Sequence, residues 1–242
     1  MQVRVATEPF KSNSVAMIKK LRIEIVSDVS CPWCVIGYRA LDAALIDLGI
    51  RQSTELYWKP FQLNPDMPPA GQNRSEHIQQ KYGINKQQSD AARKHIEDRG
   101  KELDYHFNFS DTGRVHNTFD AHRLIHWAAE SGLQTELKLA LFDLFFIDQG
   151  NTSDQPSLVN TAKAVGLDVR QAEEILHSDK YSKEVTADLE LANQRGISAV
   201  PCFIFDNKFM ISGGQSIDTF KQAITEMLDS DGAGVGSSGG ST

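Results

Sequence analysis

The sequence predicts an α/β protein in which a small α/β unit, formed by both ends of the chain, is interrupted by a large helical insertion. Three observations carry this prediction. A strand, a helix and a second strand follow one another between residues 21 and 61, helical patterns fill most of residues 65–195, and strand character returns only after residue 201. The 242 residues suit one large domain or one domain that carries an insertion.

The first three elements follow from the spacing of apolar residues. Residues 21–26 (LRIEIV) alternate apolar and charged side chains, the period of a strand with one face against a core. After the turn-like SDVS, apolar residues recur every three or four positions from Cys34 to the helix-ending Gly49. A second strand is expected over 56–61 (LYWKPF), near a proline that cannot donate a ladder hydrogen bond.

The middle of the chain is expected to form an all-helical unit. It opens with NPDMPPAGQN, a connector rich in helix breakers, and glycines stand where helices should end. The spacing predicts helices over 75–82, 86–103, 117–131, 135–148, 157–165, 169–177 and 181–195.

The C-terminal part predicts a hairpin and a final helix. Residues 202–205 (CFIF) and 209–212 flank the turn DNK, and Ser216 is placed to cap a helix that reaches Leu228. We expect residues 17–64 and 196–229 to form one discontinuous domain around the 65–195 insertion. We expect residues 230–242, a Gly/Ser tail, to be disordered. Residues 1–16 are expected to be a flexible extension, with an extra edge strand near Val3 and Val5 as the alternative.

Composition and charge exclude several classes of protein. Hydrophobic residues make up 40% and charged residues 24%, which is typical of a globular chain. The net charge of −7 disfavours nucleic acid and anionic membranes as partners. Because no apolar run approaches a signal-peptide core or the roughly 18 residues of a membrane span, we expect a soluble, cytoplasmic protein.

The cysteines point to chemistry rather than to structural disulfides. Three cysteines leave at least one thiol unpaired, and two of them form Cys31-Pro32-Trp33-Cys34 between the first strand and the first helix. Backbone N–H groups and the dipole at a helix N-terminus stabilise a thiolate, so Cys31 is expected to be the nucleophile and Cys34 the resolving thiol. Pro32 suits the first helical turn, and Trp33 offers an apolar surface near the entrance. A zinc half-site and two core cysteines are the alternatives.

A second motif completes a family resemblance. Gly196-Ile197-Ser198-Ala199-Val200-Pro201-Cys202 leads into the hairpin, and with CPWC and the helical insertion it resembles the DsbA-like branch of the thioredoxin superfamily, most closely its FrnE-like members. Supporting marks are PFQLNP after the second strand, NT and AHRL on a helix, and GGQ after the hairpin.

The resemblance implies a thioredoxin-like fold with a large all-helical insertion and a substrate-binding loop at Pro201. In that family the corresponding proline is cis and lies against the CxxC motif, which would leave the backbone of Val200 exposed to pair with an extended substrate. The resemblance also suggests that Asn117, Phe119 and Arg123 line the helical side of the cleft, with helix capping by Asn117 and a solvated Arg123 as the alternative. The implied reaction is thiol–disulfide exchange in either direction.

Other residues carry weaker hypotheses. Glu24 and Lys59 lie on neighbouring predicted strands and could carry a proton near the resolving thiol, although such residues are more often solvated. Cys202 is either a third redox thiol, a third zinc ligand or a small core residue. His122 and His126 stand four apart on one helix, and a surface pair with one packed ring is favoured over a metal site.

Three functions compete. The leading one is a dithiol–disulfide oxidoreductase or isomerase that acts on a disulfide-containing protein or a small thiol, with no resident cofactor or metal. The kappa-class glutathione transferases and hydroxychromene-carboxylate isomerases resemble this architecture, but they typically have Ser where this chain has Cys31. Glutathione therefore remains open as a reductant or co-substrate. The third reading is a zinc-binding module. Whether the chain forms a homodimer is also left open.

Overall fold

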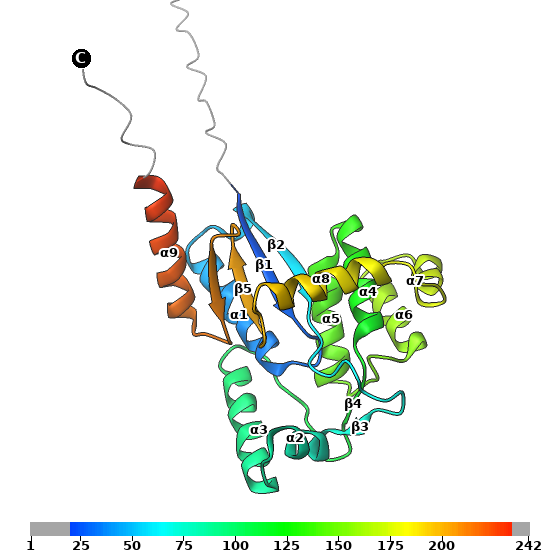
Figure 1. Ribbon diagram of the computed structural model, residues 1–242. Helices are drawn as coiled ribbons and strands as arrows, with labels where there is room; N and C mark the ends of the chain where they lie inside the picture. Colours follow the sequence, from blue (N-terminus) through cyan, green and yellow to red (C-terminus); the bar gives the residue numbers. More distant parts are fainter. Residues whose placement is uncertain (1–19, 234–242) are drawn as a thin grey trace, which may run out of the picture.

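The computed structural model describes residues 20–233, which fold around a four-stranded sheet with the strand order β2-β1-β5-β6. β1 (Leu21–Ser27) pairs in parallel with β2 (Thr54–Pro60) and antiparallel with β5 (Cys202–Phe205). β5 in turn pairs antiparallel with β6 (Phe209–Ser212). Strands from the two ends of the described chain therefore lie side by side in one sheet, as the sequence predicts (Figure 1).

One face of the sheet packs against α1 (Pro32–Asp47) and α9 (Ile217–Ala233). The approach of α1 to β5 depends on Gly37, because a Cβ atom there would lie 2.9 Å from Cζ of Phe203. The Phe203 ring also packs edge-on against Phe220 of α9, with 4.9 Å between the ring centroids. This tight contact fixes the start of α1 close to the start of β5.

The opposite face is covered by α8 (Ser182–Gln194), which crosses the sheet (Figure 1). Here Ala192 and Ile197 pack against Val26, Cys202 and Ile204 in a separate apolar cluster. Successive strand residues point to opposite faces, so β1 and β5 supply side chains to both layers.

The insertion is mainly helical, as predicted. Its helices are α2 (Arg74–Tyr82), α3 (Lys86–Lys101), α4 (Phe119–Ala128), α5 (Gln134–Phe146), α6 (Gln155–Ala164) and α7 (Val169–Leu176), followed by α8. It is not all-helical, because β3 (Gln72–Asn73) and β4 (Arg114–Val115) form an antiparallel pair. Strands of two residues are too short to produce a detectable alternation in the sequence.

α5 joins the insertion to the central sheet. The side chain of Gln134 accepts a 2.9 Å hydrogen bond from the backbone N–H of Trp58 in β2, so the first turn of α5 lies against the outer edge of that strand. The Trp58 ring also packs against Phe142 of the same helix, with 6.0 Å between the centroids. α5 therefore runs beside the sheet toward the start of α1.

Local details agree with the sequence in some places and differ in others. Asp206 and Asn207 have φ values of 47° and 57°, as the tight hairpin turn requires. Two short 3-10 helices, Arg51–Ser53 and Ala129–Ser131, precede β2 and follow α4. α9 continues to Ala233, so the first residues of the expected tail are helical. The predicted extension over 1–16 and the rest of the tail lie outside the described residues.

None of the helices in the described range, 20–233, is long and apolar enough to cross a membrane.

Candidate functional site

The CPWC segment begins where β1 ends. The backbone N–H of Cys31 donates to Asp28 O at 3.2 Å, which closes a turn after Ser27, and Pro32 then opens α1. Cys31 is the N-cap residue of that helix, with φ −94° and ψ 112°. Pro32 is tolerated there because the first helical N–H groups have no intrahelical acceptor. Cys31 therefore lies at the positive end of α1, as the sequence predicts.

The two thiols lie together below the protein surface. Cys31 is 4% exposed and Cys34 is fully buried, and both are free thiols in this structure. The backbone N–H of Cys34 donates to Cys31 O at 3.1 Å, so the two residues share one turn. Cys31 is thus the member of the pair that an incoming sulfur atom reaches first.

The structure brings the second motif to Cys31. The Sγ atom of Cys31 donates a 3.5 Å hydrogen bond to the carbonyl oxygen of Val200. The Val200–Pro201 peptide bond is cis, in agreement with the expectation from the family resemblance. Pro201 is buried against α1, since a Cβ atom on Gly37 would lie 3.0 Å from its Cγ.

Trp33 lies beside Cys31 and packs between two other segments. Its half-buried indole packs against His95 of α3, with 5.5 Å between the ring centroids. On its other side lies Gly214, where a Cβ atom would come within 3.1 Å of the indole. The insertion and the segment after β6 therefore both border the apolar surface beside Cys31.

Asn117 holds the loop after β2 in place. Its Nδ2 atom donates to Pro65 O at 2.9 Å, and its Oδ1 atom accepts from Gln62 Nε2 at 3.2 Å. Oδ1 also accepts from the backbone N–H of Phe119 at 2.8 Å, which shapes the start of α4. The structure thus places Asn117 as a link between the insertion and the loop that follows β2.

A buried carboxylate lies beneath the CPWC turn. Asp28 is fully buried, and it accepts hydrogen bonds from the backbone N–H of Leu63 at 2.7 Å and of Ser30 at 3.1 Å. Burial alone would raise the pKa of Asp28, but its interaction with His122 and these two N–H groups hold that pKa below its usual value. Asp28 is therefore a buried anion.

His122 completes this arrangement from α4. Its Nε2 atom lies 2.9 Å from Phe61 O and 3.8 Å from Asp28 Oδ1. Burial lowers the pKa of His122, which favours the neutral ring. His122 is therefore the packed ring of the expected pair. His126 is the partly exposed member, and it packs against Tyr181 with 5.4 Å between the centroids.

Lys138 of α5 is the second buried charge near the thiols. Its side chain is 1% exposed, and its Nζ donates a long 3.4 Å hydrogen bond to Ser27 O, at the end of β1. Its ammonium group also lies 5.4 Å from the Trp58 ring centroid and 5.0 Å from that of Phe142. Burial lowers the pKa of Lys138 to about 8, against the opposing effect of the nearby Cys34 and Asp28.

The environment moves the pKa values of the two thiols apart. The hydrogen bond with Cys34, followed by burial, raises the pKa of Cys31. Burial also acts to raise the pKa of Cys34, but the hydrogen bond from Cys31 and the charge of Lys138 lower it. In the substrate-free arrangement the proton therefore stays on Cys31, which differs from the expectation based on the helix dipole alone. The difference arises because the hydrogen bond with Cys34 and burial both disfavour the Cys31 thiolate.

Glu24 and Lys59 do not lie beside the thiols. Glu24 is bound by Arg22 at 3.0 Å and Arg195 at 2.9 Å, and Lys59 donates to Asp188 of α8 at 3.0 Å. Both pairs lie on the sheet face that α8 covers, whereas Cys34 belongs to α1 on the opposite face. Their proposed role as proton carriers is therefore not supported.

Cys202 is also on the α8 side. It is 1% exposed within the cluster that contains Val26 and Ile204, while its neighbour Phe203 points toward α1. The zinc reading and the third-thiol reading both require Cys202 next to Cys31, and this placement contradicts them. The interpretation as a small core residue agrees with the structure.

Arg123 is neither in the cleft nor solvated. It is 4% exposed, and its guanidinium donates to Lys180 O at 2.9 Å and also to Ile175 O and Ser178 O. These carbonyl groups belong to the end of α7 and the connection to α8. Arg123 therefore ties helices of the insertion together.

The sequence contained one unused signal for Lys138. Leu141, Phe142 and Phe145 stand three, four and seven positions after it, so the lysine lies on the apolar face of its helix. No comparable local pattern marks Asp28 or His122, whose partners come from other elements.

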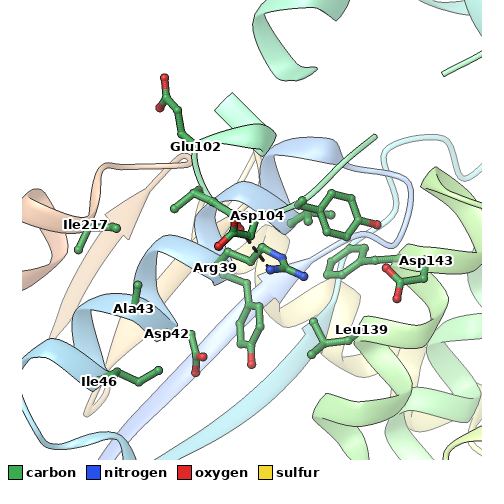
Figure 2. A pocket seen from close by; sticks show the side chains of 14 residues that line it. Arg39, Asp42, Ala43, Ile46, Glu102, Asp104, Leu139, Asp143 and Ile217 are labelled. Carbon is green, nitrogen blue, oxygen red and sulfur yellow. Dashed lines mark hydrogen bonds between the residues drawn. The ribbon is translucent and has the colours of Figure 1, made fainter. Parts of the chain in front are cut away.

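A cavity beside α1 does not contain the thiols. It has a volume of about 500 Å³ and lies along the flank of α1, between that helix, the segment after α3, and α5. Figure 2 shows Arg39 and Asp143 on opposite sides of it, with Arg39 hydrogen-bonded to Leu103 O at 3.2 Å. The candidate site around Cys31, at the start of the same helix, lies apart from this cavity.

Comparison with known proteins agrees with this geometry. A probable DsbA oxidoreductase from Streptomyces coelicolor superimposes with a TM-score of 0.82 and 31% identity, over 86% of this chain and 90% of that one. The uncharacterized protein YwbO of Bacillus subtilis is 26% identical over 211 residues, which cover 85% of this chain and 96% of that protein. The cytosolic disulfide reductase DsbM from Pseudomonas aeruginosa, solved with GSH, shares the fold with a TM-score of 0.61 and 14% identity, over 86% of this chain and 99% of that one.

The family assignment rests on nearly the whole described chain. The family described as the DSBA-like thioredoxin domain matches residues 22–225, a range that includes the central sheet, the CPWC segment and the insertion. The chain therefore belongs to the DSBA-like thioredoxin domain family.

Proposed function

We propose that this protein is a thiol–disulfide oxidoreductase in which Cys31 is the nucleophile and Cys34 the resolving thiol. The observation that carries the proposal is the placement of Cys31 at the N-cap of α1, with its sulfur 3.5 Å from the carbonyl oxygen of Val200. A helix N-terminus stabilises a thiolate as it forms, and the adjacent peptide offers a place for a substrate chain.

The reaction proceeds in two exchange steps. The Cys31 thiolate attacks one sulfur of a substrate disulfide, so that a Cys31–substrate disulfide forms and the other substrate sulfur leaves as a thiolate, which takes up a proton. Cys34 then attacks the Cys31 sulfur, closes the Cys31–Cys34 disulfide and releases the second substrate thiol. Overall, the protein dithiol loses two electrons and two protons to the substrate disulfide. The reverse sequence oxidises a substrate dithiol.

The position of the two thiols, and not their resting pKa values, sets this order of events, because the pKa of Cys31 is the raised one. In the resting arrangement the Cys31 proton is shared with Val200 O and Cys34, and a substrate that pairs with the Val200 backbone replaces the first contact. Cys31 reacts first because it lies nearer the surface, 4% exposed against 0% for Cys34. In the mixed disulfide Cys31 no longer donates to Cys34, so the charge of Lys138 and the donors from Ser27 and Asp28 are what favour the Cys34 thiolate.

The substrate-binding surface consists of Pro32, Trp33, Val200 and Pro201. Asn117 acts on it indirectly, because its hydrogen bonds fix the loop at Gln62 and Pro65. The Val200 carbonyl group beside Cys31 suits a disulfide in an extended protein segment, and a disulfide in a small molecule is the other substrate class that we include. DsbA-like oxidoreductases act on thiol or disulfide substrates, and we place this chain among them.

A glutathione redox titration of the purified protein tests the proposal. The half-buried Trp33 should report disulfide formation by fluorescence, and counting free thiols should show the loss of two per molecule. We expect one two-electron transition in the wild type and none in Cys34→Ser. A wild-type protein that shows no transition would overturn the proposal.

The Cys34→Ser variant also distinguishes disulfide exchange from the alternative, a glutathione-dependent isomerase or transferase. An isomerase or transferase that binds glutathione next to Cys31 does not require a resolving thiol. Full glutathione-dependent turnover by Cys34→Ser would therefore favour that class of reaction over disulfide exchange.

A further inference from the structure

Lys138 is an unusual residue to find inside this core. Its side chain is among the largest fully buried ones, and within residues 20–233 the hydrogen bond that its Nζ donates is the long one to Ser27 O. An ammonium group in such a place needs a nearby negative charge, because burial of an unpaired charge is strongly unfavourable. A group close to Lys138 must therefore supply that negative charge.

Four titratable groups interact electrostatically with Lys138. Cys34, Asp28 and Cys31 act on its ammonium group, and that group acts in turn on His122. His122 is held neutral by burial and supplies no negative charge. Cys31 is the thiol whose proton is retained, so the anions to consider are Asp28 and the sulfur of Cys34.

Asp28 is already committed to other donors. Its two carboxylate oxygens accept the backbone N–H groups of Leu63 and Ser30, and it lies 3.8 Å from His122. The Cys34 sulfur also has donors, namely the thiol of Cys31, the hydroxyl of Ser27 and the backbone N–H of Asp28. Lys138 lies against the same residue, Ser27, whose backbone carbonyl oxygen accepts its hydrogen bond. Of the groups that favour the charged form of Lys138, Cys34 acts most strongly, ahead of Asp28 and Cys31. The Cys34 sulfur is therefore the anion that interacts most strongly with Lys138.

We propose that Lys138, contributed by the helical insertion, is the positioning residue that stabilises the Cys34 thiolate and thereby sets the rate at which Cys34 resolves the mixed disulfide. This inference rests on the proposed exchange reaction. It replaces Glu24 and Lys59, the candidates suggested by the sequence, with a residue from a different element.

The resolving step closes the Cys31–Cys34 disulfide and releases the substrate sulfur. In the mixed disulfide, Cys34 is a thiolate beside the Lys138 ammonium group. The Cys34 sulfur attacks the Cys31 sulfur, the Cys31–Cys34 bond forms, and the bond from Cys31 to the substrate breaks with its electron pair on the leaving sulfur. The leaving thiolate takes a proton from water. Lys138, which now lacks the thiolate, gives up its own proton more readily, and water accepts it.

Reaction with dithiobis-nitrobenzoate distinguishes the attack by Cys31 from the attack by Cys34, because this aromatic disulfide releases one coloured thiolate in each step. The first release reports the attack by Cys31, and the second reports resolution by Cys34. We expect Lys138→Met to leave the first release within about twofold of the wild-type rate. We expect the second release to be about tenfold slower at pH 7, since one unit of pKa changes the thiolate fraction about tenfold.

The pH profile distinguishes a charge effect from a packing effect. Because the pKa of Lys138 is about 8, its charge assists Cys34 below that pH and is lost above it. The rate of the second release in the wild type and the same rate in Lys138→Met should therefore become more similar as the pH rises from about 7 to about 10. A difference between these two rates that is independent of pH, or an equal loss in both releases, would overturn the role of Lys138.

Two further variants complete the design. Lys59→Met removes a cation of the edge strand β2 that pairs with Asp188 on the α8 side of the sheet, and it should change neither release. Cys34→Ser should stop after the first release. If the wild type also shows only the first release, then the proposed exchange site itself is wrong. If the wild type shows both releases and Lys138→Met behaves like it, then only the role of Lys138 is wrong.

Discussion

The carboxylate of Asp28 accepts a 2.7 Å hydrogen bond from the backbone N–H of Leu63, and this bond joins the turn before Cys31 to the loop after β2. The two segments come from adjacent parallel strands, whose ends meet at the same edge of the sheet. The buried anion therefore fixes the floor of the candidate site and also shares its electrostatic environment with Cys34 and Lys138.

Asp28→Asn should destabilise the fold in a pH-dependent manner. The folded-state pKa of Asp28 is lowered, so its carboxylate stabilises the protein above the unfolded-state pKa of about 3.9, and this contribution is lost as the pH falls through the folded-state pKa. We expect a loss of about 2 kcal/mol at pH 7, because the amide is a weaker acceptor for two buried N–H groups. Urea unfolding at a series of pH values measures the difference, which should shrink toward pH 3.

Asp66→Asn is the matched control, since Asp66 is exposed on the loop after β2. It should leave the free energy of unfolding within about 0.5 kcal/mol of the wild type at each pH. A difference for Asp28→Asn that stays constant down to pH 3 would mean that the charge of Asp28 is not what stabilises the turn.

Lys138→Met should stabilise the oxidised protein at neutral pH. Burial lowers the pKa of Lys138 to about 8 in the dithiol form, and the loss of the Cys34 thiolate in the disulfide form lowers it further below the unfolded-state value of about 10.4. The unfolded chain therefore binds more protons between these values, and wild-type stability rises with pH through that window. Methionine has a similar shape without the charge, so we expect a gain of about 1–3 kcal/mol at pH 7.

Thermal or urea unfolding of the disulfide form, at pH 7 and near pH 10, measures this effect. The gain should be largest at pH 7 and should decrease toward pH 10, where the wild-type lysine is neutral in the folded state. A loss of stability at pH 7 would show that the ammonium group is well compensated even without the Cys34 thiolate.

Most of the fold could be predicted from the sequence because the patterns that indicate its helices, strands and turns are local. The alternation in residues 21–26, the helical spacing after Cys34 and the turn at Asp206 and Asn207 each depend on neighbours in the chain. The buried charges at the site were not accessible in the same way. Lys138 and Ser27 are 111 residues apart, and the pattern in α5 shows only that the lysine faces a core, not which residues that core contains.

Gly37→Ala tests the contact between α1 and the Pro201 loop. Alanine is the better helix former by about 1 kcal/mol, so a helix without neighbours would gain stability. Here the new Cβ atom would lie 2.9 Å from Phe203 and 3.0 Å from Pro201, both of which are buried. We expect a net loss of about 1–3 kcal/mol in urea unfolding, together with slower attack by Cys31 in the first coloured release. Unchanged stability and an unchanged first release would mean that the Pro201 loop is not held against α1.

Arg123→Met separates support of the insertion from a role in the cleft. The guanidinium group donates to the carbonyl groups of Ile175, Ser178 and Lys180, all far along the chain from the CPWC segment, and these acceptors lose their donors in the variant. Because the variant loses the charged hydrogen bonds by which Arg123 joins α4 to the end of α7, we expect the free energy of unfolding to fall by about 3 kcal/mol. Both coloured releases should keep their wild-type rates in the folded variant, since no atom of Arg123 is bonded to the thiol site. Urea unfolding and the two-step release assay, run on the same preparation, measure the two effects. Slower releases at a temperature where the variant is fully folded would place Arg123 in the cleft, as the family resemblance suggests.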